Sequence, residues 1–330
     1  RSYSVTGVQT CALPISIVLE ALIRYFISKK KEVWVGDSSG GTVNVQTVWD
    51  VCGLQDLANR YPIKLVNLST IGFKEVKYNG VAVKVSDVLS KCGIVINVAK
   101  LKTHSLMAYT GALKNLYGLV PGMVKSEYHR MYPDTNSFSN LLLSLYGIAK
   151  PKITYSIIDG IVGMDGAGPS AGNPKNFGVL LGSSSVSALD AVASKMMGFQ
   201  ISDVPYLSGA LHHDGILPSK IAIPQSFRHH VMPKADIRAV KMRKDMLKYI
   251  PLPIRFAFLK IYYYYPVVTP ECKRCGICVK SCPVKAISWL EDGYPRVNKD
   301  SCIKCMCCHE MCPHHAIAIH KSFIAKRILG

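Results

Sequence analysis

The chain has 330 residues, 49% of them hydrophobic, and a formal net charge of +19. This composition indicates a globular protein, and the length suits about two domains. No apolar run reaches the roughly 18 residues of a membrane-spanning helix, so we expect a soluble protein. Nine of the 12 cysteines follow residue 270. Their tight bunching favours metal or cluster ligation over disulfides, and a reducing cytoplasm.

Residues 1–16 have no clear hydrophobic period, and VTGVQTCALPIS matches the translation of a common sequencing-adaptor oligonucleotide. We therefore interpret residues 1–16 as a non-native leader. A short signal peptide is the alternative, but no basic segment precedes a continuous apolar core. Under the leader interpretation the native N-terminus is missing, and a targeting signal upstream stays open.

Helical and strand-like patterns alternate from Ile17 onward. Helical spacing of apolar residues predicts helices over 17–30, 48–61, 85–92 and 185–199. Runs rich in β-branched residues predict strands over 32–37, 63–69, 93–100, 152–160 and 176–184. This alternation predicts an α/β domain over residues 17–225, with a mainly parallel sheet flanked by helices. In such sheets, ligands bind beyond the carboxyl ends of the strands.

Two loops at those strand ends carry polar side chains suited to a ligand. Asp37 lies in GDSSGG, which is equally well explained as a turn that caps the next helix. Lys100, Lys102 and His104 follow a buried strand at a spacing of two, and would suit a carboxylate or phosphate. A solvated basic edge is the alternative for these three residues.

Two further loops complete the predicted ligand site. Lys114 and Asn115 lie in a glycine-punctuated stretch, and Asp159 ends a strand before a glycine-rich loop. That loop lacks both the Walker sequence and the dinucleotide fingerprint, so no nucleotide site is predicted. Asp159 and Asp165 could serve together in metal binding or acid–base chemistry, although Asp and Gly are common in ordinary turns.

The C-terminal end repeats one cysteine pattern, C-x2-C-x2-C-x3-C-P. An alanine–isoleucine pair follows each copy at the same distance, so the segment is an internal duplication. In the bacterial ferredoxin signature, three close thiolates hold one 4Fe-4S cube and the fourth reaches the other cube. We therefore predict two 4Fe-4S clusters, the first held by Cys272, Cys275, Cys278 and Cys312, and the second by Cys302, Cys305, Cys308 and Cys282.

A pair of zinc sites is the alternative, because zinc ligands also use C-x2-C spacing. Zinc explains neither the third cysteine of each run nor the prolines that follow. Cys307 is surplus to the pattern. We interpret it as a thiol beside the cluster sulfurs rather than as a ligand.

Four segments, VWVGDSSGG, NVAKLKTHSLMAYTGALKNLYGLVPG, IIDGIVGMDGAGPSAGNPK and ALDAVASKMMGF, occur in this order before the ferredoxin pattern. From Ile17 onward the chain thus resembles the domain-of-unknown-function 362 (DUF362) family of iron–sulfur proteins. Lys102, His104 and the stretch 111–115 carry the most specific likeness. The resemblance implies that an earlier strand is missing here. It implies no reaction, because the family's substrate chemistry is generally unassigned.

The C-terminal residues 266–330 are expected to form a small α+β ferredoxin-like domain with ten Lys or Arg against five Asp or Glu. This excess suits an acidic redox partner such as a flavodoxin, a ferredoxin or a reductase. Nucleic-acid binding is not predicted, because no matching motif or fold accompanies the basicity. Residues 226–265 are predicted as a basic helical linker. Binding to an anionic membrane surface is their less favoured interpretation.

Together these features predict an iron–sulfur oxidoreductase, or a subunit of one. Its α/β domain would bind a small anionic or carbonyl ligand while the two clusters relay electrons. Lys102, His104 and Lys114 are the predicted catalytic groups, with Asp37, Lys100, Asn115 and Asp159 as ligand-binding groups. The alternative is a non-catalytic electron carrier or docking subunit.

Overall fold

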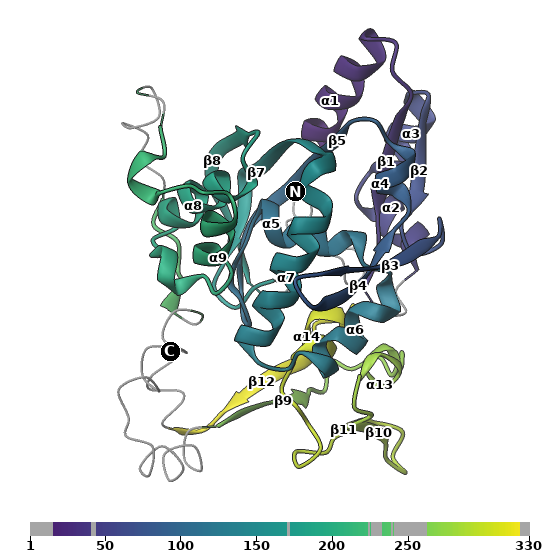
Figure 1. Ribbon diagram of the computed structural model, residues 1–330. Coiled ribbons are helices and arrows are strands. Elements are labelled where there is room, and N and C mark those ends of the chain that lie inside the picture. The colour runs from purple at the N-terminus through teal and green to yellow at the C-terminus, as the bar shows by residue number, and fades with distance from the viewer. Residues whose placement is uncertain are drawn as a thin grey trace.

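The computed structural model describes residues 16–40, 44–169, 172–223, 225, 233–238, 240 and 263–323. Figure 1 shows a larger part built of strands and helices and, below it, a smaller yellow-green module from the C-terminal residues. Residues 1–15 and most of the predicted linker 226–265 lie outside the described residues. None of the described helices has the length and apolar character needed to cross a membrane.

The main sheet has four strands in the order β6-β5-β7-β8. These are β5 (Val95–His104), β6 (Ala108–Thr110), β7 (Ile153–Asp165) and β8 (Asn173–Ser183). Only β5 and β7 run parallel, whereas β6 and β8 pair antiparallel with their neighbours. The fold is therefore mixed α/β, and the predicted mainly parallel sheet is not found. The cause is connection length, since parallel neighbours need a crossover of a dozen or more residues, and only residues 166–172 join β7 to β8.

A second small unit precedes this sheet. Its parallel strands β1 (Val33–Asp37) and β2 (Ile63–Asn67) pack with helices α1 (Ser16–Ser28) and α3 (Leu54–Arg60) around a separate apolar cluster. The single helix predicted over 48–61 is two helices, α2 (Val45–Val51) and α3. The interruption between them is at Gly53, whose φ of 71° is left-handed and ends α2.

A β-hairpin follows that the sequence-based prediction missed. Strands β3 (Phe73–Tyr78) and β4 (Val81–Ser86) pair antiparallel across Asn79 and Gly80, whose φ values are 46° and 82°. Asn-Gly between two alternating runs is a strong hairpin signal, because both turn residues need positive φ. The helix predicted over 85–92 shortens to α4 (Val88–Lys91), since β4 occupies its first residues.

Helices cover the main sheet and enclose the core. Helix α8 (Val186–Met196) packs on β7 and β8, and α5 (Ala112–Asn115) packs on β5 and β7. Helix α7 (Thr135–Ala149) lies between α5 and the β3–β4 hairpin. The remaining elements of this part are α6 (Gly122–Met131), α9 (Leu207–His213), and the 3-10 turns η2 (Leu116–Leu119), η3 (Lys150–Lys152), η4 (Ile201–Asp203) and η5 (Pro218–Lys220).

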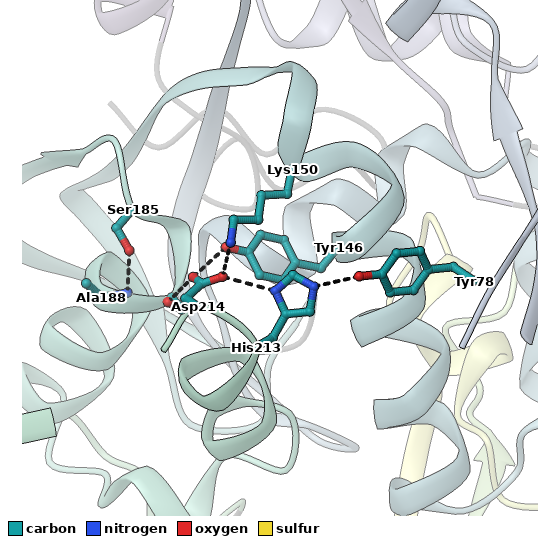
Figure 2. Close-up of polar contacts among 8 residues, drawn as sticks. Tyr78, Tyr146, Lys150, Ser185, Ala188, His213 and Asp214 are labelled. Carbon is teal, nitrogen blue, oxygen red and sulfur yellow. Dashed lines mark hydrogen bonds and ion pairs between the residues drawn. The ribbon is translucent and has the colours of Figure 1, made fainter. Parts of the chain in front are cut away.

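One carboxylate, Asp214, fastens these helices to the hairpin (Figure 2). It accepts hydrogen bonds from Lys150 at 2.6 Å, from Tyr146 at 2.7 Å and from Ser187. His213 Nδ1 also donates to it at 3.1 Å, which leaves His213 Nε2 to accept from the hydroxyl of Tyr78 at 2.8 Å. Burial raises the pKa of Asp214, but these donors together lower it below its ordinary value. The carboxylate is saturated with donors, so the network is structural.

We expect Asp214→Asn to lower the free energy of unfolding by about 2 kcal/mol. An amide cannot accept from all four donors, and a lost hydrogen bond to a charged group costs on the order of 1.5–3 kcal/mol. The measurement is the thermal midpoint by circular dichroism at pH 7. Asp236→Asn is the control, because its side chain is 41% exposed and pairs with the exposed Arg238. Equal midpoints for the two variants would contradict the structural role.

The C-terminal module keeps the duplication visible in the sequence. Strands β9 (Tyr264–Val268) and β12 (Ile317–Lys321) pair antiparallel, as do β10 (Ile287–Trp289) and β11 (Pro295–Val297). The two short helices α13 (Ile277–Ser281) and α14 (Cys307–Met311) occupy equivalent positions in the two repeats and pack together.

Candidate functional site

The structure brings the cysteines of the two repeats together in a crossed arrangement. Cys272, Cys275, Cys278 and Cys312 line one cavity, although Cys312 comes from the second repeat. In the other group, burial raises the pKa of the Cys302 and Cys308 thiols, and Cys305 and Cys282, the latter from the first repeat, lie close enough to add to this effect. We call the first four the outer cysteine set, and Cys302, Cys305, Cys308 and Cys282 the inner cysteine set.

The backbone around these thiols repeats as well. The N–H groups of Arg274 and Lys304, both left-handed in φ, donate to Cys272 and Cys302 Sγ at 3.4 Å each. The N–H groups of Ala286 and Ala316 likewise donate to Cys282 and Cys312 Sγ, at 3.2 and 3.3 Å. Hydrogen bonds of this kind stabilise thiolate sulfur. The residues present therefore fit an iron–sulfur group, which needs four thiolates with N–H donors around them.

Within the part of the protein that the structure describes, no three His, Cys, Asp or Glu side chains converge as ligands of a single metal ion would. Zinc holds its thiolates at about 2.3 Å from one centre. A four-iron cube binds one thiolate at each of four corners, and so spreads its ligands farther apart.

Helix α14 packs against the α/β part, whereas its counterpart α13 is turned to solvent. Cys307 on α14 is 5% exposed, and the sulfur of Met311 lies 3.3 Å from the position that a Cβ on Gly40 would take. At the equivalent positions of α13, Ile277 is partly exposed and Ser281 is buried within the module, while Lys280, the counterpart of Glu310, is exposed. The second repeat thus faces the predicted ligand site, and Figure 1 shows α14 tucked beneath the α/β part.

His104 lies at the end of β5 and points at α14. Its ring is 1% exposed, and Nε2 lies 3.8 Å from Glu310 Oε1. The N–H groups of Leu106 and Met107 donate to Nδ1, at 3.0 and 3.3 Å. Because Nδ1 accepts, the proton of the neutral imidazole resides on Nε2, on the side facing Glu310. His104 is therefore held as an N–H donor at the boundary of the two parts.

Lysines also lie at this boundary between α14 and the α/β part. Burial lowers the pKa of Lys114 to about 8, although Glu310 and Cys307 act to raise it. Burial raises the pKa of Glu310, opposed by Lys114 and Lys102. The ammonium of Lys114 also lies over the ring of Tyr117, 5.5 Å from its centroid. Lys102, His104, Lys114 and Glu310 thus form one electrostatic unit, which we call the lysine–histidine site.

Asp37 adjoins this unit from the end of β1. Burial raises its pKa, against the opposing effects of Lys125, the Ser38 N–H and Lys102. Lys125, from α6, donates to the carbonyl oxygen of Ser38 at 2.6 Å, and burial lowers its pKa to about 8. Opposite charges thus lie near one another at this boundary, where partial burial strengthens their interaction.

The structure places two of the other predicted ligand-binding residues, Lys100 and Asp159, in the core of the sheet, and the third, Asn115, at the exposed end of α5, hydrogen-bonded to β5. Lys100 and Asp159 form an ion pair at 2.8 Å, with side chains 1% and 0% exposed. Asp159 lies within β7, not at its end, because that strand continues to Asp165. Asn115 donates to the side chain of Asn97 at 2.8 Å and to the carbonyl of Val98 at 3.1 Å.

Sequence reasoning missed Lys125, Tyr117 and Glu310. A signal for Glu310 existed, because the two ferredoxin repeats differ where Lys280 and Ile277 are replaced by Glu310 and Cys307. Departures from an internal repeat mark positions that one copy alone uses. No comparable signal marked Lys125, because α6 reaches Ser38 only through the tertiary fold.

Known proteins share parts of this sequence. A "thylakoid-associated protein" of Synechocystis is 35% identical over 35% of this chain and 36% of its own length. An "uncharacterized polyferredoxin-like protein" of Methanocaldococcus jannaschii is 29% identical over 25% of this chain and 58% of its own length. One polypeptide of the anaerobic dimethyl sulfoxide reductase of Escherichia coli is 38% identical over 17% of this chain and 27% of its own length. The chain thus spans well under two thirds of each relative.

Family models match both parts. Residues 271–316 match a 4Fe-4S dicluster domain, so the C-terminal module is of the iron–sulfur ferredoxin type. The other match covers residues 9–195 and begins inside the segment predicted as a non-native leader. Since this match takes in more than half of the sequence, the protein belongs to the family described as "domain of unknown function (DUF362)".

Proposed function

We propose that this protein transfers electrons through two 4Fe-4S clusters to a ligand held at the lysine–histidine site. The observation that carries the proposal is the contact between α14 and β5, where Glu310 lies 3.8 Å from His104. The helix that bears the inner ligand Cys308 is the same helix that faces the predicted ligand-binding lysines. An electron at the inner cysteine set is therefore next to the lysine–histidine site.

Different residues would serve electron transfer and ligand binding. The outer and inner cysteine sets would each hold one cluster, and these clusters supply one-electron transfer. Lys102 and Lys114 would attract a small anionic or carbonyl ligand, and the Nε2–H of His104 would donate a hydrogen bond to its oxygen. Such a protein is an oxidoreductase or a subunit of one. Cluster thiolates persist where thiols stay reduced, which suits the cytoplasm.

A carrier or docking subunit that converts no substrate is the second candidate. The likeness to a polyferredoxin-like protein and to one polypeptide of a larger reductase favours it. In either case the basic exterior of the module suits an acidic redox partner, such as a flavodoxin, a ferredoxin or a reductase. Ligand binding at the lysine–histidine site distinguishes the two candidates.

We expect sulfate, an anion that does not itself titrate near neutral pH, to bind with a Kd that is flat at neutral pH and rises once Lys114 and Lys125 lose their protons. The pKa of Lys114 and of Lys125 is about 8, so each lysine is positive below that pH and neutral above it. The negative charge of a bound cluster raises the pKa of Lys114, which moves its transition upward. If one charged lysine is required, the Kd rises up to about tenfold per pH unit. Isothermal titration calorimetry of the anaerobically prepared protein measures this Kd as a function of pH.

The control pair is Lys102→Gln and Lys74→Gln. Lys102 acts on both Asp37 and Glu310, whereas Lys74 lies exposed on the β3–β4 hairpin. Only Lys102→Gln should weaken sulfate binding. Mass spectrometry of anaerobically purified protein would show any native ligand. A protein that binds neither sulfate nor a co-purifying molecule would favour the docking subunit.

A further inference from the structure

We propose that a bound anion at the lysine–histidine site and an electron on the inner cluster oppose each other, so that reduction expels the anion. This inference rests on the proposed function and adds a regulation to it. The anion would bind the oxidised protein tightly and the reduced protein weakly. The outer cluster would take little part in this coupling.

The first step of the argument is the asymmetry of the two repeats. Helix α14 is buried against the α/β part through Cys307 and Met311. In the outer repeat, Cys275 and Lys280 are exposed to solvent. Water screens a charge on the outer side, whereas at the α14 boundary Glu310 is only 20% exposed and the screening is partial. Only the inner cysteine set therefore exerts a strong field on the lysine–histidine site.

The second step is that α14 carries charge to the lysine–histidine site. Glu310 Oε1 lies 3.8 Å from His104 Nε2, and Glu310 is on the same short helix as the inner ligand Cys308. The Cys307 thiol, which is 5% exposed, donates a hydrogen bond to Cys305. The inner ligands Cys305 and Cys308 and the carboxylate of Glu310 thus lie on one short segment, which reaches the lysine–histidine site at His104.

The third step is the charge balance. An oxidised cluster with four thiolates carries a charge of about −2, and one electron takes it to about −3. The electron comes from an external low-potential one-electron donor, which is oxidised, and no covalent bond forms or breaks. The added negative charge interacts with the same ammonium groups that would bind the anion. At an effective dielectric constant of about 20, a unit charge about 10 Å away would weaken the binding of a singly charged anion by about tenfold.

Linkage makes the effect reciprocal. If reduction weakens anion binding tenfold, saturation with the anion must lower the equilibrium constant for reduction of the inner cluster by the same factor. For one electron, a tenfold change corresponds to a potential lower by about 59 mV. The potential of the outer cluster should stay where it is.

The experiment is a redox titration of the two-cluster protein followed by electron paramagnetic resonance, with and without saturating phosphate. We expect phosphate to lower one of the two potentials by about 59 mV and to leave the other unchanged. Calorimetry on protein reduced electrochemically should then give a phosphate Kd about tenfold weaker than on oxidised protein. The factor from the shift in potential and the factor from the two Kd values must agree, because both measure the same coupling free energy.

Charge variants identify the cluster concerned. Lys114→Gln removes a positive charge beside α14 and should lower the same potential that phosphate lowers, even without ligand. Lys280→Gln, on the exposed helix α13, is the matched control and should leave that potential unchanged. The phosphate titration of the unaltered protein stands even if Lys114→Gln fails to fold.

The outcomes separate the two hypotheses. Phosphate that binds both redox states equally would overturn the coupling and leave the proposed function intact. Equal shifts of both potentials would overturn the inner assignment. Phosphate that binds neither state would remove the proposed ligand site, and the coupling with it.

Discussion

Replacing Cys275 or Cys312 with alanine is expected to abolish the same cluster, although the two residues are 37 positions apart in the sequence. Each variant should keep about four iron and four sulfide per molecule instead of about eight of each, because a cube that loses a thiolate is released or degraded. The reason is the crossed geometry, in which both residues line one cavity. Cys305→Ala and Cys282→Ala should together define the second cluster. Iron and acid-labile sulfide analysis, with electron paramagnetic resonance spectra of the reduced variants, makes the measurement.

Cys307→Ala provides the matched control for the cysteine series. It removes a thiol from the same helix but, in our assignment, no ligand, so both clusters should remain. Because the Cys307 thiol donates to Cys305, its removal should lower the potential of the inner cluster. Loss of a cluster in this variant would overturn the register of the inner set. Stoichiometric zinc without sulfide in the unaltered protein would overturn the iron–sulfur assignment altogether.

Lys100→Met is expected to lower the free energy of unfolding by about 3–5 kcal/mol, because it leaves the buried carboxylate of Asp159 without its ammonium partner. The pair is 2.8 Å apart, and neither side chain is more than 1% exposed. The backbone N–H of Ile161 still donates to Asp159 at 3.0 Å, but one N–H does not replace a charge. Thermal unfolding at pH 7 should show a midpoint lower by roughly 10 °C.

Two comparisons test whether the Lys100–Asp159 pair is structural. Lys100→Met with Asp159→Leu replaces the pair by apolar groups and should recover most of the loss. Lys64→Met breaks an ion pair with Glu32 whose side chains are 64% and 63% exposed, and should change little. If Lys100→Met kept full stability and instead lost phosphate binding, Lys100 would be a ligand-binding residue, as the sequence-based prediction holds.

Local patterns predicted most of the elements and half of the candidate site. Apolar spacing is a property of neighbouring residues, so it located α1, β1, β2 and α8 closely, whereas it ended β7 five residues too early. It also located the step from Lys102 to His104 at the end of a buried strand. Apolar spacing could not distinguish the role of Lys102 from that of Lys100. A register shift between them on β5 changes how each residue pairs with β7. Lys100 pairs with Asp159 in the core, whereas Lys102 acts at the boundary.

The sequence by itself determined the iron–sulfur character of the protein, because cysteine spacing is local and a cube tolerates few arrangements of its thiolates. The direction of the strands depended on the tertiary structure, since the short connection 166–172 makes β8 antiparallel. The charged neighbours of the lysines also depended on the tertiary structure. Glu310 and Cys307 lie about 200 residues from Lys114 in the sequence, and only the packing of α14 on the α/β part makes their charges act on it. Spacing shows what a segment can bind, whereas the field at a site depends on which distant segments exclude water from it.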